Sequence, residues 1–169
     1  MAFSSRTADS LARKVGWRGE LDKASRDLNI KYIKSEAIKG SKKEKYAITL
    51  RLPGILEKIK RNKPHLLDIY NPQLRKITRR LAENADADVR VNAVRAAAEM
   101  KYHDVVMSRV ADESPLVRSE VAHFAFITKN EYMLKRLKNS ETELRKRRKA
   151  DPVVLKTIDV YEERTGKEL

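Results

Sequence analysis

Two stretches of this sequence repeat one pattern at a fixed distance, and the repeat limits the folds that the chain can adopt. Asp86–Met100 reads DADVRVNAVRAAAEM and Glu113–Ile127 reads ESPLVRSEVAHFAFI, so that Val89-Arg90 recurs as Val117-Arg118 after 28 residues. Leu144-Arg145 follows after a further 27 residues. Periods of about 20 to 50 residues are typical of helical arrays, in which each unit stacks on the next.

Each unit also carries the signals of a helix. Residues suited to a helix N-cap open the units: Asp86 and Asp88, then Glu113 and Ser114 before Pro115, then Ser140 and Glu141. Apolar residues follow at helical spacing, namely Val89, Ala93, Ala96, Ala97 and Met100, and then Val117, Val121, Ala122 and Ala125. A second, shorter helix is predicted from Val105, Val106 and Val110, and again from Met133, Leu134 and Leu137.

Together these residues resemble the short HEAT-like repeats of the PBS-lyase type, and also the leucine-rich variant repeat. The resemblance covers about residues 72–150. It implies that Arg90, Arg118 and Arg145 form a structural ladder, in which each arginine pairs with an acid of an adjacent turn or unit. In the third copy, SETELRKRRKADPVVLKTI, Lys and Arg replace Ala and Val, so this helix is either a polar cap of the stack or a ligand-binding helix.

The segment KYAITLRLPGILEKIKRN, which spans Lys45–Asn62, carries a different period. Apolar and other residues alternate from Lys45 to Leu52, which predicts a half-buried strand, with Pro53 in the first turn of a following helix. A second strand upstream, with a turn near Gly40 and Ser41, completes a basic β-hairpin. We therefore predict a mainly α fold: an N-terminal helical segment with a small hairpin (1–63), followed by a HEAT-like helical-repeat stack (64–169).

Residues 45–84 also resemble the ribbon-helix-helix DNA-binding motif. The resemblance implies that Ala47, Thr49 and Arg51 point into a major groove and that NPQLRKITRRLAEN is the second helix. Alternatively, the hairpin only caps the first helix of the stack. Farther upstream, SLARKVGWRGELDKASRDLNI has the four-residue Ala12 to Gly16 spacing of a helix-turn-helix, with an ordinary amphipathic helical pair as the alternative.

The charge of the chain indicates a polyanionic partner. The formal net charge is +14. Residues 39–80 hold 13 Lys and Arg against 3 Asp and Glu, and residues 134–149 hold 8 against 2, whereas residues 81–133 hold 6 against 9. We predict a non-enzymatic nucleic-acid-binding protein, with duplex DNA favoured because the few aromatic residues disfavour single-strand stacking. An adaptor that grips an acidic protein is the alternative. The candidate contact residues are Lys42, Lys43, Lys45, Arg51, Arg75, Arg79, Arg80, Arg145, Arg147 and Arg148.

No pattern in the sequence points to catalysis, a metal or a cofactor. Cys is absent, and His65, His103 and His123 do not have a metal-ligand spacing. Glycine-rich phosphate loops and nucleophile elbows are absent too. Some HEAT-like proteins are DNA glycosylases that stack aromatic residues against a damaged base, but Trp17, the only Trp, lies outside the repeats.

No apolar run approaches the length of a membrane span, and no secretory signal is recognisable. We expect a soluble protein that is not secreted, located in the cytoplasm or at the nucleoid or nucleus, without membrane partners. The first 17 residues also resemble a mitochondrial transit peptide, because they contain Ser, Arg and a single acid. The oligomeric state is left open.

Overall fold

A computed structural model of the chain describes residues 18–146 and 149–169, and all its regular elements there are helical. Residues 18–27 are helical at the start of the described part. They are followed by α2 (Ile30–Lys39), α3 (Lys42–Asn62), the 3-10 turn η1 (Pro64–Leu66), α4 (Leu67–Ala82), α5 (Ala87–Glu99), α6 (His103–Met107), α7 (Pro115–Ile127), α8 (Glu131–Lys146) and α9 (Pro152–Thr165). The predicted mainly α class is confirmed. The Ala12 to Gly16 spacing and the first 17 residues lie outside the described part.

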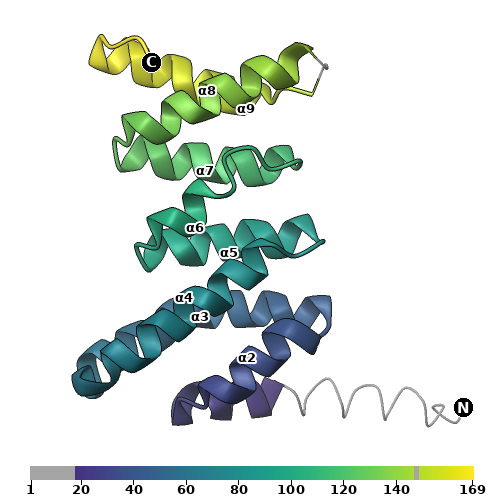
Figure 1. Cartoon of the computed structure of the whole chain (residues 1–169), viewed down its shortest axis with the longest axis vertical. Coiled ribbons are helices and arrows are strands. Elements are labelled where there is room, and N and C mark those ends of the chain that lie inside the picture. The colour runs from purple at the N-terminus through teal and green to yellow at the C-terminus, as the bar shows by residue number, and fades with distance from the viewer. Residues whose placement is uncertain (1–17, 147–148) are drawn as a thin grey trace, which may run out of the picture.

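The helices are arranged in two rows along one long axis, with α2 at one end and α9 at the other (Figure 1). In the first row α3, α5, α7 and α9 pack in succession, and in the second row α2, α4 and α6 pack in succession beside them. The helix α8 packs on both α7 and α9. The core therefore runs along the axis between the rows, and each helix from α2 to α6 packs against helices of both rows.

Aspartate caps fix where α5 and α9 begin, and a proline in the first turn marks the start of α7. Asp86 caps α5 by accepting hydrogen bonds from the amides of Asp88 and Val89, and Asp151 caps α9 through the amide of Val153. Ser114 is the N-cap residue of α7, where Pro115 follows in the first turn. The predicted helices after Asp86 and Ser114 are confirmed, and so is the burial of their apolar faces.

The predicted hairpin is wrong, because residues 42–62 form the single helix α3. Ser41 and Glu44 form a capping box, in which each side chain accepts a hydrogen bond from the backbone amide of the other residue. The buried residues of α3 include Ile48, Leu52, Ile55, Leu56 and Ile59, which recur at helical spacing over more residues than the short alternation covers. The ribbon of a ribbon-helix-helix motif is therefore not formed at 45–52, and Pro53 lies inside the helix and not in its first turn.

The predicted turn at Gly40 and Ser41 connects two helices and not two strands. Gly40 ends α2, and a Cβ atom placed on it would lie 2.5 Å from the carbonyl oxygen of Glu36. Only glycine fits this close approach without a shift of the backbone. The chain therefore turns at the predicted place, because Gly40 permits the turn and Ser41 caps the helix that follows.

The helix start predicted at Ser140 and Glu141, before Leu144-Arg145, is wrong. Residues 131–146 form one continuous helix, so Ser140 and Glu141 lie inside α8 and do not start a helix. The next helix of the first row begins at Asp151 and Pro152, where Val154 is buried at the position that Val89 and Val117 occupy after their caps. The physical reason is that a cap and an N1 proline start a helix, whereas an apolar-Arg dipeptide alone does not.

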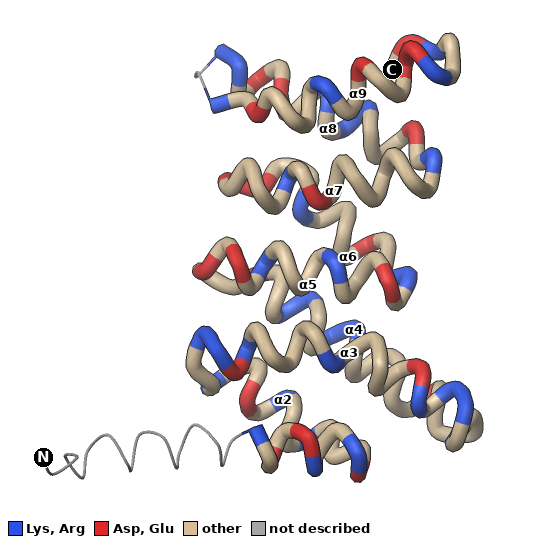
Figure 2. Tube along the Cα trace, turned by 180° about the vertical axis from the view of Figure 1, so that it is seen from behind, with Lys and Arg blue, Asp and Glu red and all other residues tan. Residues whose placement is uncertain are grey.

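Positive charge gathers at the α2 to α4 end of the stack. The helix α3 carries seven Lys and Arg against two Glu, and α4 carries four against one Asp. By contrast, α5 and α7 each carry as many acids as bases. Figure 2 shows the basic residues at both ends of α3 and along α4. This end is where an anionic partner is attracted most strongly.

Candidate nucleic-acid interface

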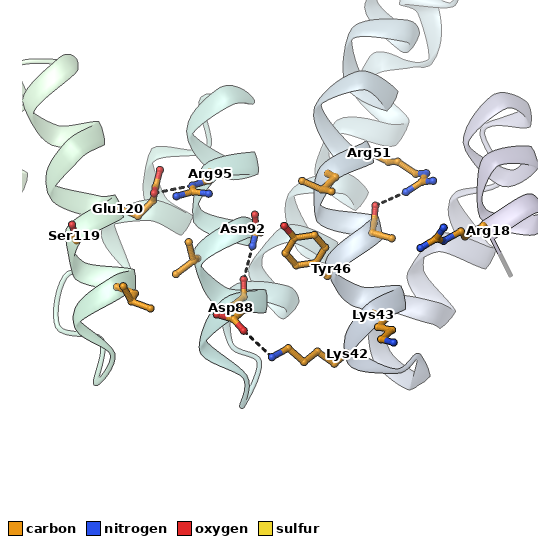
Figure 3. A pocket seen from close by; sticks show the side chains of 14 residues that line it. Arg18, Lys42, Lys43, Tyr46, Arg51, Asp88, Asn92, Arg95, Ser119 and Glu120 are labelled. Carbon is orange, nitrogen blue, oxygen red and sulfur yellow. Dashed lines mark hydrogen bonds and ion pairs between the residues drawn. The ribbon is translucent and has the colours of Figure 1, made fainter. Parts of the chain in front are cut away.

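A groove of about 1100 Å³ crosses the first row of helices from α3 over α5 to α7 (Figure 3). The helix α3 supplies one wall, through side chains that recur at helical spacing. These are Lys42, Lys43, Tyr46, Ala47, Leu50 and Arg51. The other lining residues are Arg18 from the start of the described part, Asp88, Val91, Asn92 and Arg95 from α5, and Leu116, Ser119 and Glu120 from α7.

Five of the lining residues are cations and two are carboxylates. The cations are Arg18, Lys42, Lys43, Arg51 and Arg95, and the carboxylates are Asp88 and Glu120. Three of the five cations come from α3, and Arg18 comes from the helical residues 18–27, so the α3 wall of the groove is basic. An extended anion that lies along this wall meets more cations than carboxylates among the lining residues.

Lys42 bridges α3 to the start of α5. Its Nζ lies 2.8 Å from Asp86 Oδ2 and 2.7 Å from Asp88 Oδ2. Hydrogen bonds with Asp86 and then Asp88 raise the pKa of Lys42, so it stays protonated at neutral pH. The same contact with Lys42 is the main reason that the pKa of Asp86 is lowered.

The other groove cations differ in whether an acid accompanies them. Arg51 Nη2 lies 2.6 Å from Asp22 Oδ1, and Arg95 Nε lies 2.8 Å from Glu120 Oε2. Lys43 makes no ion pair or side-chain hydrogen bond within residues 18–146 and 149–169, and it is exposed. Lys43 is therefore the groove cation most available to an incoming anion.

Large apolar side chains lie exposed among these charges. Tyr46 is 40% exposed, Leu50 is 59% exposed and Leu116 is 62% exposed. Tyr46 projects from α3 toward α5 (Figure 3). Apolar surface beside fixed charges is typical of binding grooves, because burial of the apolar surface stabilises the complex and the charges orient the ligand.

The candidate cations of α4 lie in the second row and not in this groove. Arg75 and Arg79 both pair with the carboxylate of Asp104 on α6, and the Arg75 guanidinium lies 5.9 Å from the ring centre of Tyr102. Burial raises the pKa of Asp104, but the two arginines outweigh this effect and lower it. Arg80 has no such acid and lines a smaller cleft between α2 and α4.

The remaining candidates are divided between α3 and the end of α8. Lys45 is half-buried on α3, outside the stripe that lines the groove. Arg145 is exposed in the last turn of α8, while Arg147 and Arg148 lie outside the described residues. The structure therefore brings Lys42, Lys43 and Arg51 together in the groove and places the other described candidates elsewhere.

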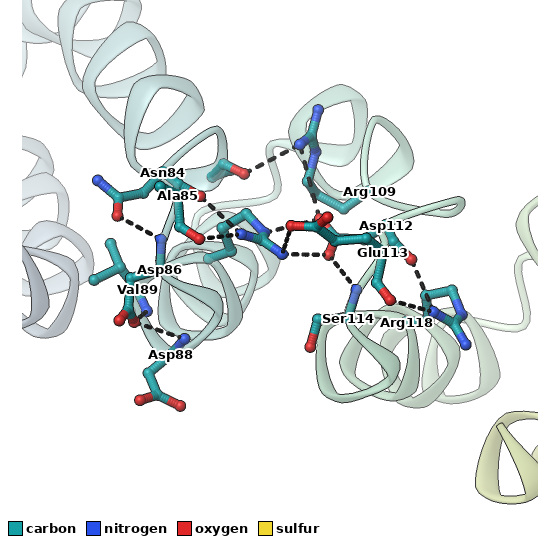
Figure 4. A network of polar contacts seen from close by, with 12 residues as sticks. Asn84, Ala85, Asp86, Asp88, Val89, Arg109, Asp112, Glu113, Ser114 and Arg118 are labelled. Carbon is teal, nitrogen blue, oxygen red and sulfur yellow. Dashed lines mark hydrogen bonds and ion pairs between the residues drawn. The ribbon is translucent and has the colours of Figure 1, made fainter. Parts of the chain in front are cut away.

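The repeated arginines 90 and 118 are buried and held by equivalent partners (Figure 4). Arg90 donates to both carboxylate oxygens of Asp112, at 3.0 and 2.8 Å, and to the carbonyls of Asn84 and Ala85. Its hydrogen bond with Asp112 raises its pKa. Arg118 donates to Glu141 at 2.5 Å and to the carbonyls of Asp112 and Glu113, which lie 28 positions after those that Arg90 contacts.

Both arginines of this ladder are held by partners inside the protein and cannot contact a ligand, so Arg90 and Arg118 are structural. Arg118 also donates to the carbonyl of Lys149, which ties α7 to the segment after α8. Arg145, the predicted third rung, is exposed and not part of the ladder. The position four residues after the cap of α9 is Leu155.

Sequence reasoning missed Arg18, Arg95 and the apolar strip of the groove. Arg18 and Arg95 stand alone in the sequence, whereas the candidates were chosen from runs of basic residues. The helical period offered a signal for Arg95, since it falls opposite the buried Ala93, Ala96 and Ala97. Asp86 and Asp88 reach Lys42 across more than forty residues, and no local pattern predicts that contact.

Within residues 18–146 and 149–169, no three His, Asp or Glu side chains are arranged to hold a metal ion. The three histidines are exposed and scattered over η1, α6 and α7. No helix in this part of the chain is long and apolar enough to cross a membrane. Comparison of the chain with family models, with curated proteins and with solved structures finds no match.

Proposed function

We propose that the protein binds duplex nucleic acid, preferably DNA, without catalysing a reaction, and that the groove across α3, α5 and α7 is the contact surface. The observation that carries this proposal is the basic α3 wall, with Lys42, Lys43 and Arg51 in one stripe and Lys43 without an acid partner. We further propose that the two rows of helices are a HEAT-like repeat stack that holds this wall rigid.

Phosphate groups are the ligand that such a wall fits best. A duplex presents one negative charge for about every 1.7 Å of helix axis, so one backbone offers phosphates to several turns of α3 at once. Lys42 is half-exposed despite its two acids, and Lys43 is exposed, so both ammonium groups can reach a phosphate. Contacts of this kind position the duplex and do not read its sequence.

The test is binding of a labelled duplex to a variant that removes two charges from the wall. Lys42→Gln with Lys43→Gln should weaken duplex binding about tenfold or more, because each phosphate contact contributes to affinity. The matched control is Lys135→Gln with Arg136→Gln on α8, two exposed neighbours without partners in the described part of the chain. It removes the same net charge away from the groove and should change affinity little.

Stability must be followed in both variants, because Lys42 also pairs with Asp86 and Asp88. Its side chain is 54% exposed, so loss of these pairs should change the melting temperature only slightly. Equal weakening by the two double variants would mean that only net charge matters. That result, or a lack of saturable duplex binding by the wild type, would overturn the proposal.

The exposed Tyr46, Leu50 and Leu116 favour a second candidate, an adaptor whose groove grips an acidic protein. Large apolar side chains at a groove are typical of protein recognition. Polyglutamate separates the two functions, since it offers charge without phosphate geometry. Under the first proposal the duplex binds much more tightly than polyglutamate of equal charge. Under the second proposal a protein partner competes with the duplex for the groove.

A further inference from the structure

A second cleft, separate from the groove, lies between α2 and α4 in the other row of helices. It has a volume of about 280 Å³ and is lined by Lys34, Ala37, Ile38, Gln73, Lys76, Ile77 and Arg80. The volume is near the lower limit for small-molecule pockets, which begin at about 300 Å³. The cleft can therefore take one large side chain or a group of similar size.

The sequence builds this cleft from two helical stripes. On α2, Ile30, Ile33 and Ala37 are buried, while Ile38 turns outward and is 48% exposed, one turn after Lys34. On α4, the buried Leu74, Ile77 and Leu81 face the core. Gln73, Lys76 and Arg80 recur three and four residues apart, which places them on one side of the helix.

The charges around this cleft have one sign. Lys34, Lys76 and Arg80 are exposed, and no acid lines the cleft. None of the three makes an ion pair or a side-chain hydrogen bond in the described part of the chain. The neighbouring Arg75 and Arg79, in contrast, share Asp104. Three cations without counter-charge around an apolar floor leave a site complementary to an anion that carries an apolar group.

We propose that this cleft binds an acidic peptide segment of a partner protein through one large apolar anchor. The anchor packs on Ala37, Ile38 and Ile77, while carboxylates of the segment pair with Lys34, Lys76 and Arg80. This is the recognition of an acidic motif by a cationic cluster combined with an apolar anchor in a groove between helices. The site is independent of the duplex interface, because its residues come from α2 and α4.

The apolar floor favours a peptide over the other anions that a basic surface attracts. A sugar-phosphate backbone has no large apolar group to bury in a cleft of this size, so phosphates bind only the charged rim. A membrane surface is contacted by a broad apolar face that enters the lipid. Here Ile38 is the one exposed large apolar side chain among the lining residues, and the rest of the apolar surface is recessed.

Methyl NMR of the full-length protein with labelled isoleucines tests this proposal, since Ile38 and Ile77 report on the cleft. The probe is a synthetic peptide of glutamates around a single leucine, and a second peptide carries alanine in place of the leucine. We expect saturable shifts of the Ile38 and Ile77 methyl signals with the leucine peptide. The alanine peptide should bind about tenfold more weakly, because it lacks most of the apolar surface.

Lys76→Gln with Arg80→Gln should weaken peptide binding about fivefold or more, since two partly exposed ion pairs are removed. The control Lys135→Gln with Arg136→Gln should bind the peptide like the wild type. Equal binding of the two peptides, or unmoved Ile38 and Ile77 signals, would overturn the proposal. So would saturable shifts of the same two signals by a duplex or by phosphatidylglycerol vesicles.

The two proposals fail in different measurements. Lys42→Gln with Lys43→Gln should leave peptide binding intact while it weakens duplex binding. If Lys76→Gln with Arg80→Gln weakened duplex and peptide binding equally, the cleft would belong to the nucleic-acid surface, and the peptide proposal would be wrong.

Discussion

Arg118 and Arg145 each follow an apolar residue and lie 27 positions apart in the sequence. Their surroundings in the fold are nevertheless opposite. Arg118 is 1% exposed and its guanidinium is held by Glu141 and by backbone carbonyls. Arg145 is exposed at the end of α8 and has no partner in the described residues. A basic residue that recurs in the sequence is therefore available to a ligand only when the fold leaves it at the surface.

The same difference separates the centre of the stack from its α2 to α4 end. In the centre, Arg90 and Arg118 form ion pairs with acids inside the protein, and the helices α5 and α7 carry no net charge. At the α2 to α4 end, Lys43, Lys34, Lys76 and Arg80 remain without acids. The central cations hold the stack together, and those at this end are available to partners.

The largest effect on stability is expected from Glu141→Ala, which removes the buried carboxylate that pairs with Arg118. Glu141 is fully buried, accepts from Arg118 at 2.5 Å and accepts from the amide of Asp151 at 2.6 Å. Its removal leaves the Arg118 charge buried without a counter-charge, which should cost about 3–5 kcal/mol of unfolding free energy. Urea denaturation measures this loss.

Two further variants make that result interpretable. Glu143→Ala changes an exposed carboxylate of the same helix and should cost about 0.5 kcal/mol or less. Arg118→Met with Glu141→Leu removes both charges and should cost less than Glu141→Ala alone, as buried pairs replaced by apolar groups often do. If Glu141→Ala matched Glu143→Ala, the ladder would not be a structural device.

A smaller effect is expected from Asp151→Ala at the cap of α9. Asp151 is 9% exposed and its side chain accepts a hydrogen bond from the Val153 amide at 2.8 Å. Loss of a helix N-cap typically costs about 1 kcal/mol. Thermal unfolding should show a lower melting temperature for Asp151→Ala, while Asp151→Ser, which keeps an oxygen acceptor, should recover most of it. No difference between the two variants would argue against the cap.

Acid should weaken the contacts that cross between helices at the α2 to α4 end. The pKa values of Asp86 and Asp104 are lowered in the folded protein, so both groups bind protons more readily when the chain is unfolded. Their contribution to stability is complete above the ordinary aspartate pKa of about 3.9 and is lost as pH falls through the folded values. Urea unfolding of the wild type and of Asp104→Asn as a function of pH measures the contribution of Asp104. The difference in unfolding free energy between the two proteins should disappear at low pH.

The smallest effect is expected from Arg145→Gln, the exposed counterpart of the ladder. An exposed side chain without internal partners should change the unfolding free energy by about 0.5 kcal/mol or less. Thermal unfolding measured beside Arg118→Gln gives the contrast directly. A loss for Arg145→Gln comparable to that for Arg118→Gln would show that the apolar-Arg dipeptide, and not burial, determines the structural role.

The sequence predicted the helical class and the helices after Asp86 and Ser114 better than it predicted the other boundaries. Val89 and Val117 mark α5 and α7 correctly because the Asp86 cap precedes one and Ser114-Pro115 precedes the other. No helix begins just before Leu144-Arg145, and this dipeptide misled the alignment. The strand at 45–52 was wrong because a short alternation also fits part of a helical face. Ile55, Leu56 and Ile59 continue the helical period beyond it.

The candidate groove was only partly predictable. Runs of Lys and Arg indicated Lys42, Lys43 and Arg51, because charge density is visible in sequence. The pairing of Arg75 and Arg79 with Asp104 depends on packing of α4 against α6, and local sequence patterns do not predict it. The same holds for the cleft between α2 and α4, which exists only because those helices lie side by side.

The salt dependence of duplex affinity tests most directly whether the α3 wall holds phosphates. For the wild type, log affinity should fall linearly with log salt concentration. For Lys42→Gln with Lys43→Gln, the slope should be smaller in magnitude by about 2, near 0.9 for each lost phosphate contact. Lys135→Gln with Arg136→Gln should keep the wild-type slope. Identical slopes for wild type and Lys42→Gln with Lys43→Gln would contradict the account, because these lysines would then not neutralise phosphates.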